Sequence, residues 1–336
     1  MTITASRRAV LAGLAGTTLA APVLHAPALH AQGAGFPERQ IRFILPSGPG
    51  GSPDILTRLL VDRMAKNTGR QFVVDYRPGG GTSVASLYVA RQPADGYTVY
   101  YTGPSFTVTP AVNRQFARTL DIRTAFEPIT MAAAAPFLLV VHPAVPARSF
   151  AELVAWLRAN PGLANYAANA ATTPHLLMEE LRRQLELDYT AVGFGGEAEG
   201  IQAVLSGRVQ MMLAIIGPAK PHIDSGGLRV LATIGSKRHP ALPEVPTIPE
   251  TGAAPGFEPA DIWLGYVAPG GTPPAAIDWL QREIARAVRH PDLHQVLVEQ
   301  QGFEAIGSDP AVFRAAILRD LDRYTRVASA AGLQTN

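Results

Sequence analysis

Cysteine is absent from the 336 residues of this chain, and charged residues make up only 17% of it. The lack of cysteine excludes disulfide bonds, thiolate metal sites, cysteine nucleophiles and lipid attachment through a cysteine. No dense run of lysine and arginine is present, so the basic face of a nucleic-acid-binding protein is not expected. Hydrophobic residues make up 47% of the chain, enough for a large core, and the length favours two domains.

Motifs of nucleotide-binding and catalytic sites are also missing from the sequence. There is no GxxxxGKS/T motif, GPGGSP and GGGTSV lack the last glycine of GxGxxG, and GPSFT lacks the last glycine of GxSxG. No HExxH occurs, and His290 and His294, which have helical spacing, flank Pro291 near a helix start. A solvated surface is favoured there over a metal site. We therefore expect neither a metal nor a cofactor.

The first 34 residues are typical of an export signal. Arg7 and Arg8 form a twin-arginine pair, followed by an uncharged stretch rich in Ala and Leu. A membrane anchor is the alternative, but prolines interrupt the apolar run. The chain has 29 Lys and Arg against 27 Asp and Glu, and loss of the two signal arginines leaves 27 against 27. We expect a near-neutral monomer, released into the periplasm after cleavage between Ala26 and Gly35.

Strand-like and helix-like segments alternate along the rest of the chain. Apolar runs such as QIRFIL and QFVVDY precede helical patterns, and Ser149 with Glu152 forms a capping box. VQMMLAII is predicted as one buried strand, and the last third as helices over 273–288, 292–301 and 310–330. This alternation predicts α/β domains with mostly parallel sheets, in which ligands bind at the carboxyl ends of the strands.

Four strand-to-helix junctions are rich in glycine or hydroxyl groups and contain no lysine or arginine. They are Pro46–Asp54, Pro78–Ser83, Asn169–His175 and Gly193–Glu197. The first turn of a helix has unpaired N–H groups, glycine lets a ligand approach them, and hydroxyls add neutral donors, so such junctions suit a carboxylate. The candidate ligand-binding residues are Ser47, Gly48, Gly50, Gly51, Ser52, Asp54, Gly81, Thr82, Ser83, Gly103, Ser105, Asn169, Thr172, Thr173, His175, Phe194, Gly195 and Gly196.

The missing cations narrow the choice of ligand. Several phosphates would need Lys or Arg, so a small monocarboxylate or a polar neutral compound is predicted first, and a dicarboxylate second. Glycine-rich turns are also common in α/β proteins that bind nothing there. Asp54 could simply cap its own helix, and Asp54, Glu197 and Glu199 would repel an anion that they faced. Phe106 and Phe194 could support the body of a ligand or belong to the core.

Several segments, taken in order, resemble the extracytoplasmic solute receptors of the tripartite tricarboxylate transporters, the Bug family. They include IRFILPSGPGGSPDILTRLL, VVDYRPGGG, ADGYTVYYTG, FLLVVHPAVPARSFAEL and LANYAANAATTPHL. The stretch Pro221–Gly252 is the most specific, and the likeness covers nearly the whole chain after the signal.

The resemblance implies a two-lobed periplasmic binding protein of type II-like architecture that closes a cleft by a hinge. Each lobe would be a doubly wound, mostly parallel α/β domain. Lobe 1 would comprise 35–134 plus 258–336, and lobe 2 would comprise 135–257, with crossings near Met131–Pro136 and Ala254–Asp261. Loop N–H groups, hydroxyls and water would hold a small carboxylate for uptake, with small and large membrane subunits as partners.

The sequence departs from the family pattern at several loop positions. Ser83, Val84 and Ala85 stand where members have Asn, an apolar residue and Gly; GFGGE replaces PYKGG; and Gln210 and Ala214 replace acids. These changes argue against the usual dicarboxylate.

Two other functions are compatible with the same sequence. The lobes could present a ligand-dependent surface to a membrane signalling partner. Less favoured is a periplasmic hydrolase or isomerase with Ser52 or Ser105 as nucleophile and His175 as base, because no third group is placed to orient the base.

Overall fold

A computed structural model describes residues 35–49, 52–168, 172–300 and 302–335 of the chain. The chain divides into two units, Met1–Phe36 and Pro37–Asn336, and the second unit contains all of the secondary structure given below. The predicted export signal lies outside the described residues. In the described ranges, no helix is long and apolar enough to span a membrane.

The first sheet has six strands in the order β11-β4-β10-β3-β1-β2. Its strands are β1 (Ile41–Leu45), β2 (Phe72–Tyr76), β3 (Thr98–Thr102), β4 (Phe126–Pro136), β10 (Asp261–Pro269) and β11 (Glu304–Ala305). β1 pairs in parallel with β2 and β3, whereas β10 runs antiparallel to β3 and β4, and β11 runs antiparallel to β4. The carboxyl ends of β2, β1 and β3 therefore lie side by side at one edge of this sheet.

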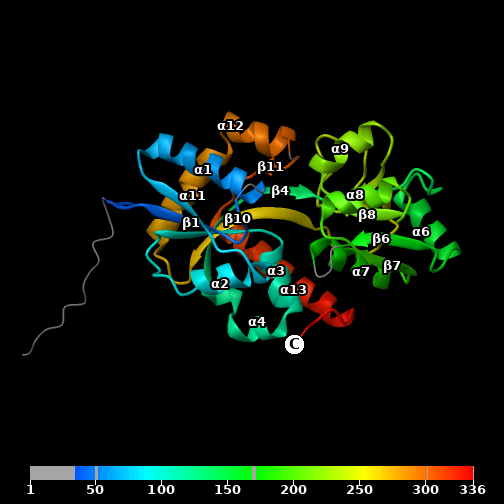
Figure 1. Cartoon of the computed structure of the whole chain (residues 1–336), viewed down its shortest axis with the longest axis horizontal. Helices are drawn as coiled ribbons and strands as arrows, with labels where there is room; N and C mark the ends of the chain where they lie inside the picture. Colours follow the sequence, from blue (N-terminus) through cyan, green and yellow to red (C-terminus); the bar gives the residue numbers. More distant parts are fainter. Residues whose placement is uncertain (1–34, 50–51, 169–171, 301, 336) are drawn as a thin grey trace, which may run out of the picture. The chain divides into compact units, whose positions relative to one another are not determined.

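Helices cover both faces of the first sheet (Figure 1). α1 (Ser52–Thr68) contacts α11 (Pro274–Val288) and α12 (Pro291–His294), and α11 also packs on β4. On the other face, α3 (Ser105–Val112) packs against the long α13 (Pro310–Ala330). The remaining helices joined to this sheet are α2 (Ser83–Val89), which follows the short 3₁₀ turn η1 (Gly80–Thr82), α4 (Arg114–Thr119), α5 (Ile122–Ala125) and the π-helix η2 (Gln295–Gln300).

The second sheet has five strands in the order β7-β6-β8-β5-β9. Its strands are β5 (Leu138–Val141), β6 (Ala164–Ala168), β7 (Tyr189–Gly193), β8 (Met211–Ala214) and β9 (Arg229–Thr233). β6 pairs in parallel with β7 and β8, and β5 runs antiparallel to β8 and β9. The helices that accompany this sheet are α6 (Phe150–Ala159), α7 (Thr173–Gln184), α8 (Glu197–Leu205), α9 (Ile216–Asp224) and α10 (Ile248–Thr251).

Both sheets are mixed, so the predicted α/β class is confirmed but the expectation of mostly parallel sheets is wrong. In the first sheet the cause is β4 and β10, two long antiparallel strands that lie side by side (Figure 1), and in the second it is β5, which runs antiparallel to β8 and β9. The sequence pattern did not predict either β4 or β10 as a strand. β4 contains MAAAAP, and alanine and proline have low β-propensity, whereas β10 lies before the helix predicted over 273–288, in a stretch for which no element is predicted.

Two predicted elements end at the wrong residues. VQMMLAII is not one strand, because β8 ends at Ala214 and α9 begins at Ile216. Two prolines within α9 conceal its helical pattern in the sequence. The helix predicted over 292–301 is the short α12 followed by a π-helix over Gln295–Gln300. The capping residue Ser149 behaves as predicted, and its hydroxyl accepts the Glu152 N–H at 3.2 Å.

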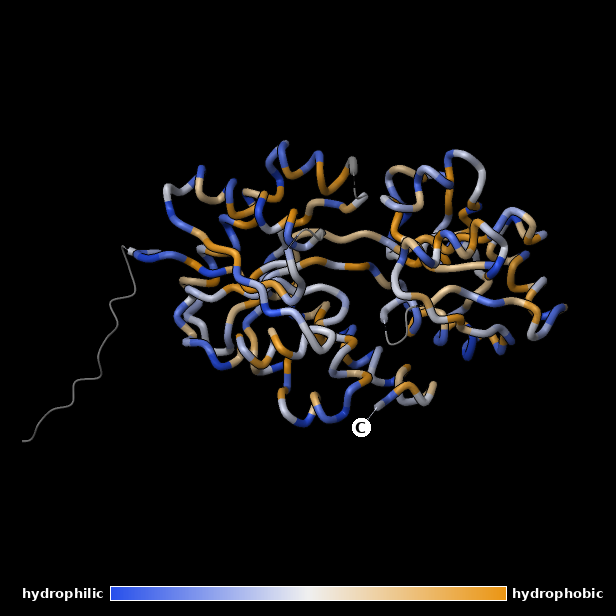
Figure 2. The backbone as a smooth tube through the Cα atoms, in the orientation of Figure 1, coloured by the Kyte–Doolittle hydropathy of each residue, from blue (hydrophilic) through white to orange (hydrophobic). Residues whose placement is uncertain are grey.

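Each sheet has its own hydrophobic core. In the first, Tyr100, Phe106 and Phe126 pack edge-on or tilted at 5.3 to 6.1 Å between ring centroids. In the second, strands β5 and β8 pack against α8 and α9 through aliphatic residues such as Val140 and Met212. The hydrophobic colouring follows the strands of both sheets, and the hydrophilic colouring follows the outer turns of the helices (Figure 2).

The chain passes from the first sheet to the second at Phe137, between β4 and β5, and returns between β9 and β10. A buried side chain of α13 ties the C-terminal helix to both regions. Arg323, 2% exposed, donates to Glu180 of α7 at 2.8 Å and to the carbonyls of Glu258 and Pro259 at 2.6 and 3.0 Å. The boundaries of the two lobes remain a prediction.

Candidate functional site

Three strand-to-helix junctions meet at the carboxyl edge of the first sheet, after β1, β2 and β3. The first runs from β1 to α1 and contains Ser47 and Gly48; Gly50 and Gly51 lie outside the described residues, as does the side chain of Ser52. The Ser47 hydroxyl oxygen is buried and has no hydrogen-bond partner among the described residues. A buried polar atom without a partner is destabilising, and a ligand or water at this loop would satisfy it.

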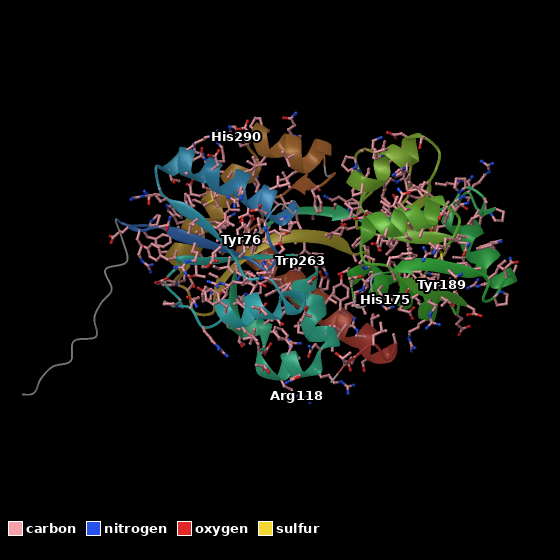
Figure 3. All side chains as sticks on the ribbon, in the orientation of Figure 1. Tyr76, Arg118, His175, Tyr189, Trp263 and His290 are labelled. Atoms are coloured by element: carbon pink, nitrogen blue, oxygen red, sulfur yellow. The ribbon has the colours of Figure 1, made fainter. Side chains whose placement is uncertain are left out.

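Asp54, in the first turn of α1, is engaged by its own neighbours. It is 4% exposed, and its Oδ1 accepts a hydrogen bond from the Tyr76 hydroxyl at 2.6 Å and from Arg58 Nε at 2.8 Å. Tyr76 lies at the end of β2 (Figure 3), so this carboxylate joins the first junction to the second. The hydrogen bond to Asp54 raises the pKa of Tyr76. These contacts favour the structural interpretation of Asp54 over direct contact with a ligand.

The second junction, from β2 to α2, has an unusual backbone. Gly79, Gly80 and Gly81 all have positive φ, and Thr82 follows with φ 92°, one of two non-glycine residues of the described chain with positive φ. A Cβ on Gly80 would lie 2.1 Å from Ser83 Oγ, so glycine is required there. The Thr82 hydroxyl oxygen is buried without a partner in the described ranges. Strained residues of this kind are concentrated at binding sites.

The third junction, from β3 to α3, contains Gly103, Pro104 and Ser105. Ser105 is exposed at the first residue of α3, and the next two N–H groups, those of Phe106 and Thr107, donate to the Gly103 and Pro104 carbonyls at 2.9 and 3.3 Å. Phe106 is 1% exposed and belongs to the aromatic core, so it does not support a ligand.

The matching edge of the second sheet carries junctions after β6, β7 and β8. Asn169 lies outside the described residues. Thr172 is the N-cap residue of α7, and Thr173 and His175 are buried in its first turn. His175 lies on α7 (Figure 3). Its ring is 6.2 Å from the Tyr166 ring, and burial lowers its pKa. A histidine packed in this way is a residue of the core side of α7.

Phe194, Gly195 and Gly196 form the turn from β7 to α8. The Phe194 N–H donates to the Ala168 carbonyl at 2.9 Å, which holds this turn beside the end of β6. The Arg208 guanidinium lies 5.1 Å from the centre of the Phe194 ring. Gly195 N–H donates to Glu199 at 2.9 Å, so Glu199 stabilises the turn.

A cavity of about 230 Å³ lies where these second-sheet junctions meet. Three predicted ligand-binding residues, Thr172, Phe194 and Gly196, line it. The first-sheet elements contribute Pro104 and Ile262. Its other lining residues are Phe137, Ala167, Ala168, Pro174, Glu197, Gly200, Met212, Leu213 and Ile215. The cavity is therefore mainly apolar, and the candidate residues of the β1 and β2 junctions lie outside its lining.

Glu197 is a lining residue that the sequence did not single out as a candidate. Its Oε1 accepts the Ile215 N–H at 2.5 Å, which links the start of α8 to the start of α9. Burial raises the pKa of Glu197 to about 7, and the Ile215 N–H opposes this shift. One signal in the sequence could have pointed to this residue, because an acid replaces glycine in the junction GFGGE.

The arrangement of two mixed α/β sheets with their loops at the carboxyl strand ends is that of periplasmic binding proteins. The solved structure of the periplasmic binding protein BugD is 25% identical to this chain with a TM-score of 0.70, covering 90% of this chain and 100% of that one. The structure of Rhodopseudomonas palustris Rpa4515 with adipate is 32% identical with a TM-score of 0.72, covering 88% of this chain and 98% of that one. MatC from the same organism, with bound malate, is 26% identical with a TM-score of 0.69, covering 87% and 99%.

The family is shown by sequence. The model of the tripartite tricarboxylate transporter family receptor, TctC, matches residues 56–333. A UPF0065 protein from the tcbD-tcbE intergenic region of Pseudomonas sp. strain P51 is 32% identical, covering 87% of this chain and 86% of the relative. BugT of Bordetella pertussis is 29% identical, covering 88% and 90%. This chain belongs to the TctC family of receptors, as the resemblance to the Bug proteins indicated.

Proposed function

We propose that this chain is a periplasmic receptor that captures a small organic acid by closing two lobes around it. The observation that carries the proposal is the cavity formed where helix starts meet at the carboxyl edge of the second sheet. Unpaired N–H groups at such helix starts stabilise a carboxylate. The structures with adipate and malate support the same ligand chemistry in relatives of this chain.

The lobes would be 35–134 plus 258–336 and 135–257. The first would bring the loops after β1, β2 and β3 to the ligand, and the second would bring those after β6, β7 and β8. The buried hydroxyls of Ser47 and Thr82 support this arrangement, because both lack partners among the described residues and could donate to a ligand oxygen. Closure would select a state that the free protein already populates.

The ligand would be small. The cavity of about 230 Å³ is below the range of about 300–1,000 Å³ usual for sites of larger ligands. No Lys or Arg belongs to its lining, so a tricarboxylate would lack cationic partners. The chain would act by binding alone and deliver the ligand to the membrane subunits of a tripartite transporter.

Thermal unfolding in the presence of small organic acids tests this proposal. A ligand at about one hundred times its Kd stabilises the folded state by about 2.7 kcal/mol, so the melting temperature should rise with ligand concentration. Each acid should be compared with its primary amide, which keeps the shape and removes the charge. No stabilisation by any acid, together with turnover of one of them, would mean that the chain is an enzyme instead.

Export requires its own test. Arg7 and Arg8 motivate a twin-arginine route, and replacing both with lysine should leave the precursor in the cytoplasm. Unchanged export of the double variant would indicate the general secretory route.

A further inference from the structure

Glu197 gives the cavity a chemistry that a receptor for dicarboxylates does not need. The described lining of the cavity consists of apolar side chains, glycines, the Thr172 hydroxyl and this one carboxylate. No cationic side chain contributes to the electrostatics of Glu197; its environment is set by burial and by the Ile215 N–H. A carboxylate held in an apolar cavity without a cation is destabilised when ionised.

The position of Glu197 also affects the helix starts that would bind an anion. Its Oε1 accepts a hydrogen bond from the N–H of Ile215, the N-cap residue of α9. One of the three helix starts on the second sheet thus already has a carboxylate from the protein itself. A ligand carboxylate placed there would compete for the same N–H and face a like charge. The helix start of α7, with Thr172, has no acid in its first turn.

Resting on the function proposed above, we propose that Glu197 is a specificity-determining residue that pairs with a protonated nitrogen of the ligand. The ligand is then a zwitterion: one carboxylate and one ammonium or similar cationic nitrogen, joined by a short apolar body. The carboxylate binds at the α7 start and the hydroxyl-bearing loops of the first sheet. The nitrogen binds at the second oxygen of Glu197, which has no hydrogen bond to a described residue, and the body packs on Phe194 and Met212.

The preference depends on the difference in binding free energy between an ammonium ligand and a dicarboxylate, and not on the strength of one contact alone. An ammonium supplies the cation that the cavity lining lacks. Because it is a donor, it does not compete with Glu197 for the Ile215 N–H. A second ligand carboxylate would have to bind beside Glu197 as a like charge, or bind only when one of the two is protonated. Specificity of this kind combines an attractive partner for one ligand with repulsion of the other.

Two matched series of acids test this inference. Adipate, δ-aminovalerate and hexanoate share one carboxylate and one chain, and differ only in a terminal carboxylate, ammonium or methyl group. Succinate, β-alanine and butyrate form the shorter series. Calorimetry at about pH 8, where Glu197 is mostly ionised, measures each Kd. We expect the wild-type protein to bind the ammonium member of at least one series about tenfold or more tightly than its dicarboxylate.

The Glu197→Gln variant keeps the shape and the acceptor for Ile215 but removes the charge. We expect it to lose at least about tenfold of the preference for the ammonium ligand. Glu199→Gln is the matched control, because Glu199 lies on the same helix and outside the lining of this cavity, and the preference should persist. Circular dichroism and thermal unfolding establish that both variants are folded.

The outcomes separate this inference from the function on which it rests. Equal or tighter binding of the dicarboxylates by the wild-type protein, or an unchanged preference in Glu197→Gln, overturns the role of Glu197 and leaves the receptor function standing. If hexanoate and butyrate bind as tightly as the amines, the site recognises only an apolar end and the inference is wrong. If none of the six acids binds and no acid of the wider thermal screen stabilises the protein, both the inference and the receptor function are wrong.

Discussion

The two sheets use the same strand arrangement to present loops of different chemistry. In each, one central strand has parallel neighbours on both sides, β1 between β2 and β3, and β6 between β7 and β8, followed by an antiparallel strand. The first sheet offers hydroxyls and strained glycine-rich backbone, whereas the second offers an apolar cavity with an acid. Backbone topology places the loops, and a few junction residues decide what each set can bind.

This contrast suggests a division of labour between the two sheets. The loops of the first sheet contribute donors without a formal charge, which suit any carboxylate. The junctions of the second sheet add shape, through Phe194, and a carboxyl group, that of Glu197, whose charge depends on pH. Substitutions in the first set should therefore weaken all ligands together, whereas substitutions in the second should change the preference among them.

The largest expected effect comes from removing Arg323, which links α13 to α7 and to the segment before β10. Arg323→Ala removes a buried cation and leaves Glu180 and two carbonyls without their donor. Breaking a buried ion pair on one side typically costs about 3–5 kcal/mol, so the free energy of unfolding should fall by roughly that amount in urea denaturation. Arg326→Ala, an exposed position on the same helix, is the control and should change it by no more than about 0.5 kcal/mol. Equal effects of the two substitutions would mean that the buried pair contributes nothing.

The next largest effect should come from the strained turn of the first sheet. Thr82→Pro cannot keep φ 92°, because proline fixes φ near −65°, and it also loses the N–H that donates to the Gly79 carbonyl. We expect binding of every acid to weaken at least about a hundredfold by calorimetry, equivalent to about 2.7 kcal/mol. Gly81→Pro should do the same.

Thr82→Gly separates backbone shape from the hydroxyl group. Glycine accepts positive φ without strain, so this variant should keep the turn and lose only what the hydroxyl contributes, about 1 kcal/mol. Binding in both Thr82→Pro and Thr82→Gly close to that of the wild-type protein would exclude this turn from the site.

The parts of this structure that the sequence predicted are those with local signals. Ser149 caps its helix as expected. The junctions around Thr82, Thr172 and Phe194 lie at strand ends as predicted, because glycine, hydroxyl and proline residues mark helix starts within a few positions. The resemblance to the family predicted the fold, because several such junctions occur in the same order as in the family.

The parts that the sequence did not predict depend on contacts between distant segments. β4 and β10 pair antiparallel although many elements separate them, and the alanine-rich β4 has no clear strand pattern. Glu197 looked like a helix-start acid, and only the structure shows that it lines a cavity and accepts the Ile215 N–H. Asp54 illustrates the reverse case, because its partners Arg58 and Tyr76 make it a structural residue. Pattern alone cannot distinguish these two acids, since each stands at a helix start.

The acid of the second sheet should also give stability a dependence on pH. Burial raises the pKa of Glu197 from 4.5 to about 7, so the folded protein binds more protons than the unfolded chain between these values. The resulting stabilisation is complete below about pH 4.5 and is lost as the pH rises through 7. Glu197→Gln removes this contribution, and at about pH 8 the variant should be more stable than the wild type by at most about 3 kcal/mol.

Urea denaturation at several pH values measures this difference. The gain of Glu197→Gln over the wild type should grow from about pH 5 to about pH 8, whereas Glu199→Gln should show no such trend. A gain that does not change with pH would place Glu197 in a solvated environment.

The smallest expected effect concerns the hydroxyl next to the strained turn. Ser83 is the first residue of α2, and its N–H donates to the Gly80 carbonyl, so the backbone of this junction does not depend on its side chain. Ser83→Ala should therefore leave stability nearly unchanged and remove one neutral donor. A hydrogen bond of this kind contributes about 0.5–1.5 kcal/mol, which corresponds to a loss of affinity of roughly two- to tenfold in calorimetry. Because the donor carries no charge, the loss should be similar for all acids in both series. A loss confined to the dicarboxylates would mean that the first sheet, and not Glu197, discriminates between ligands.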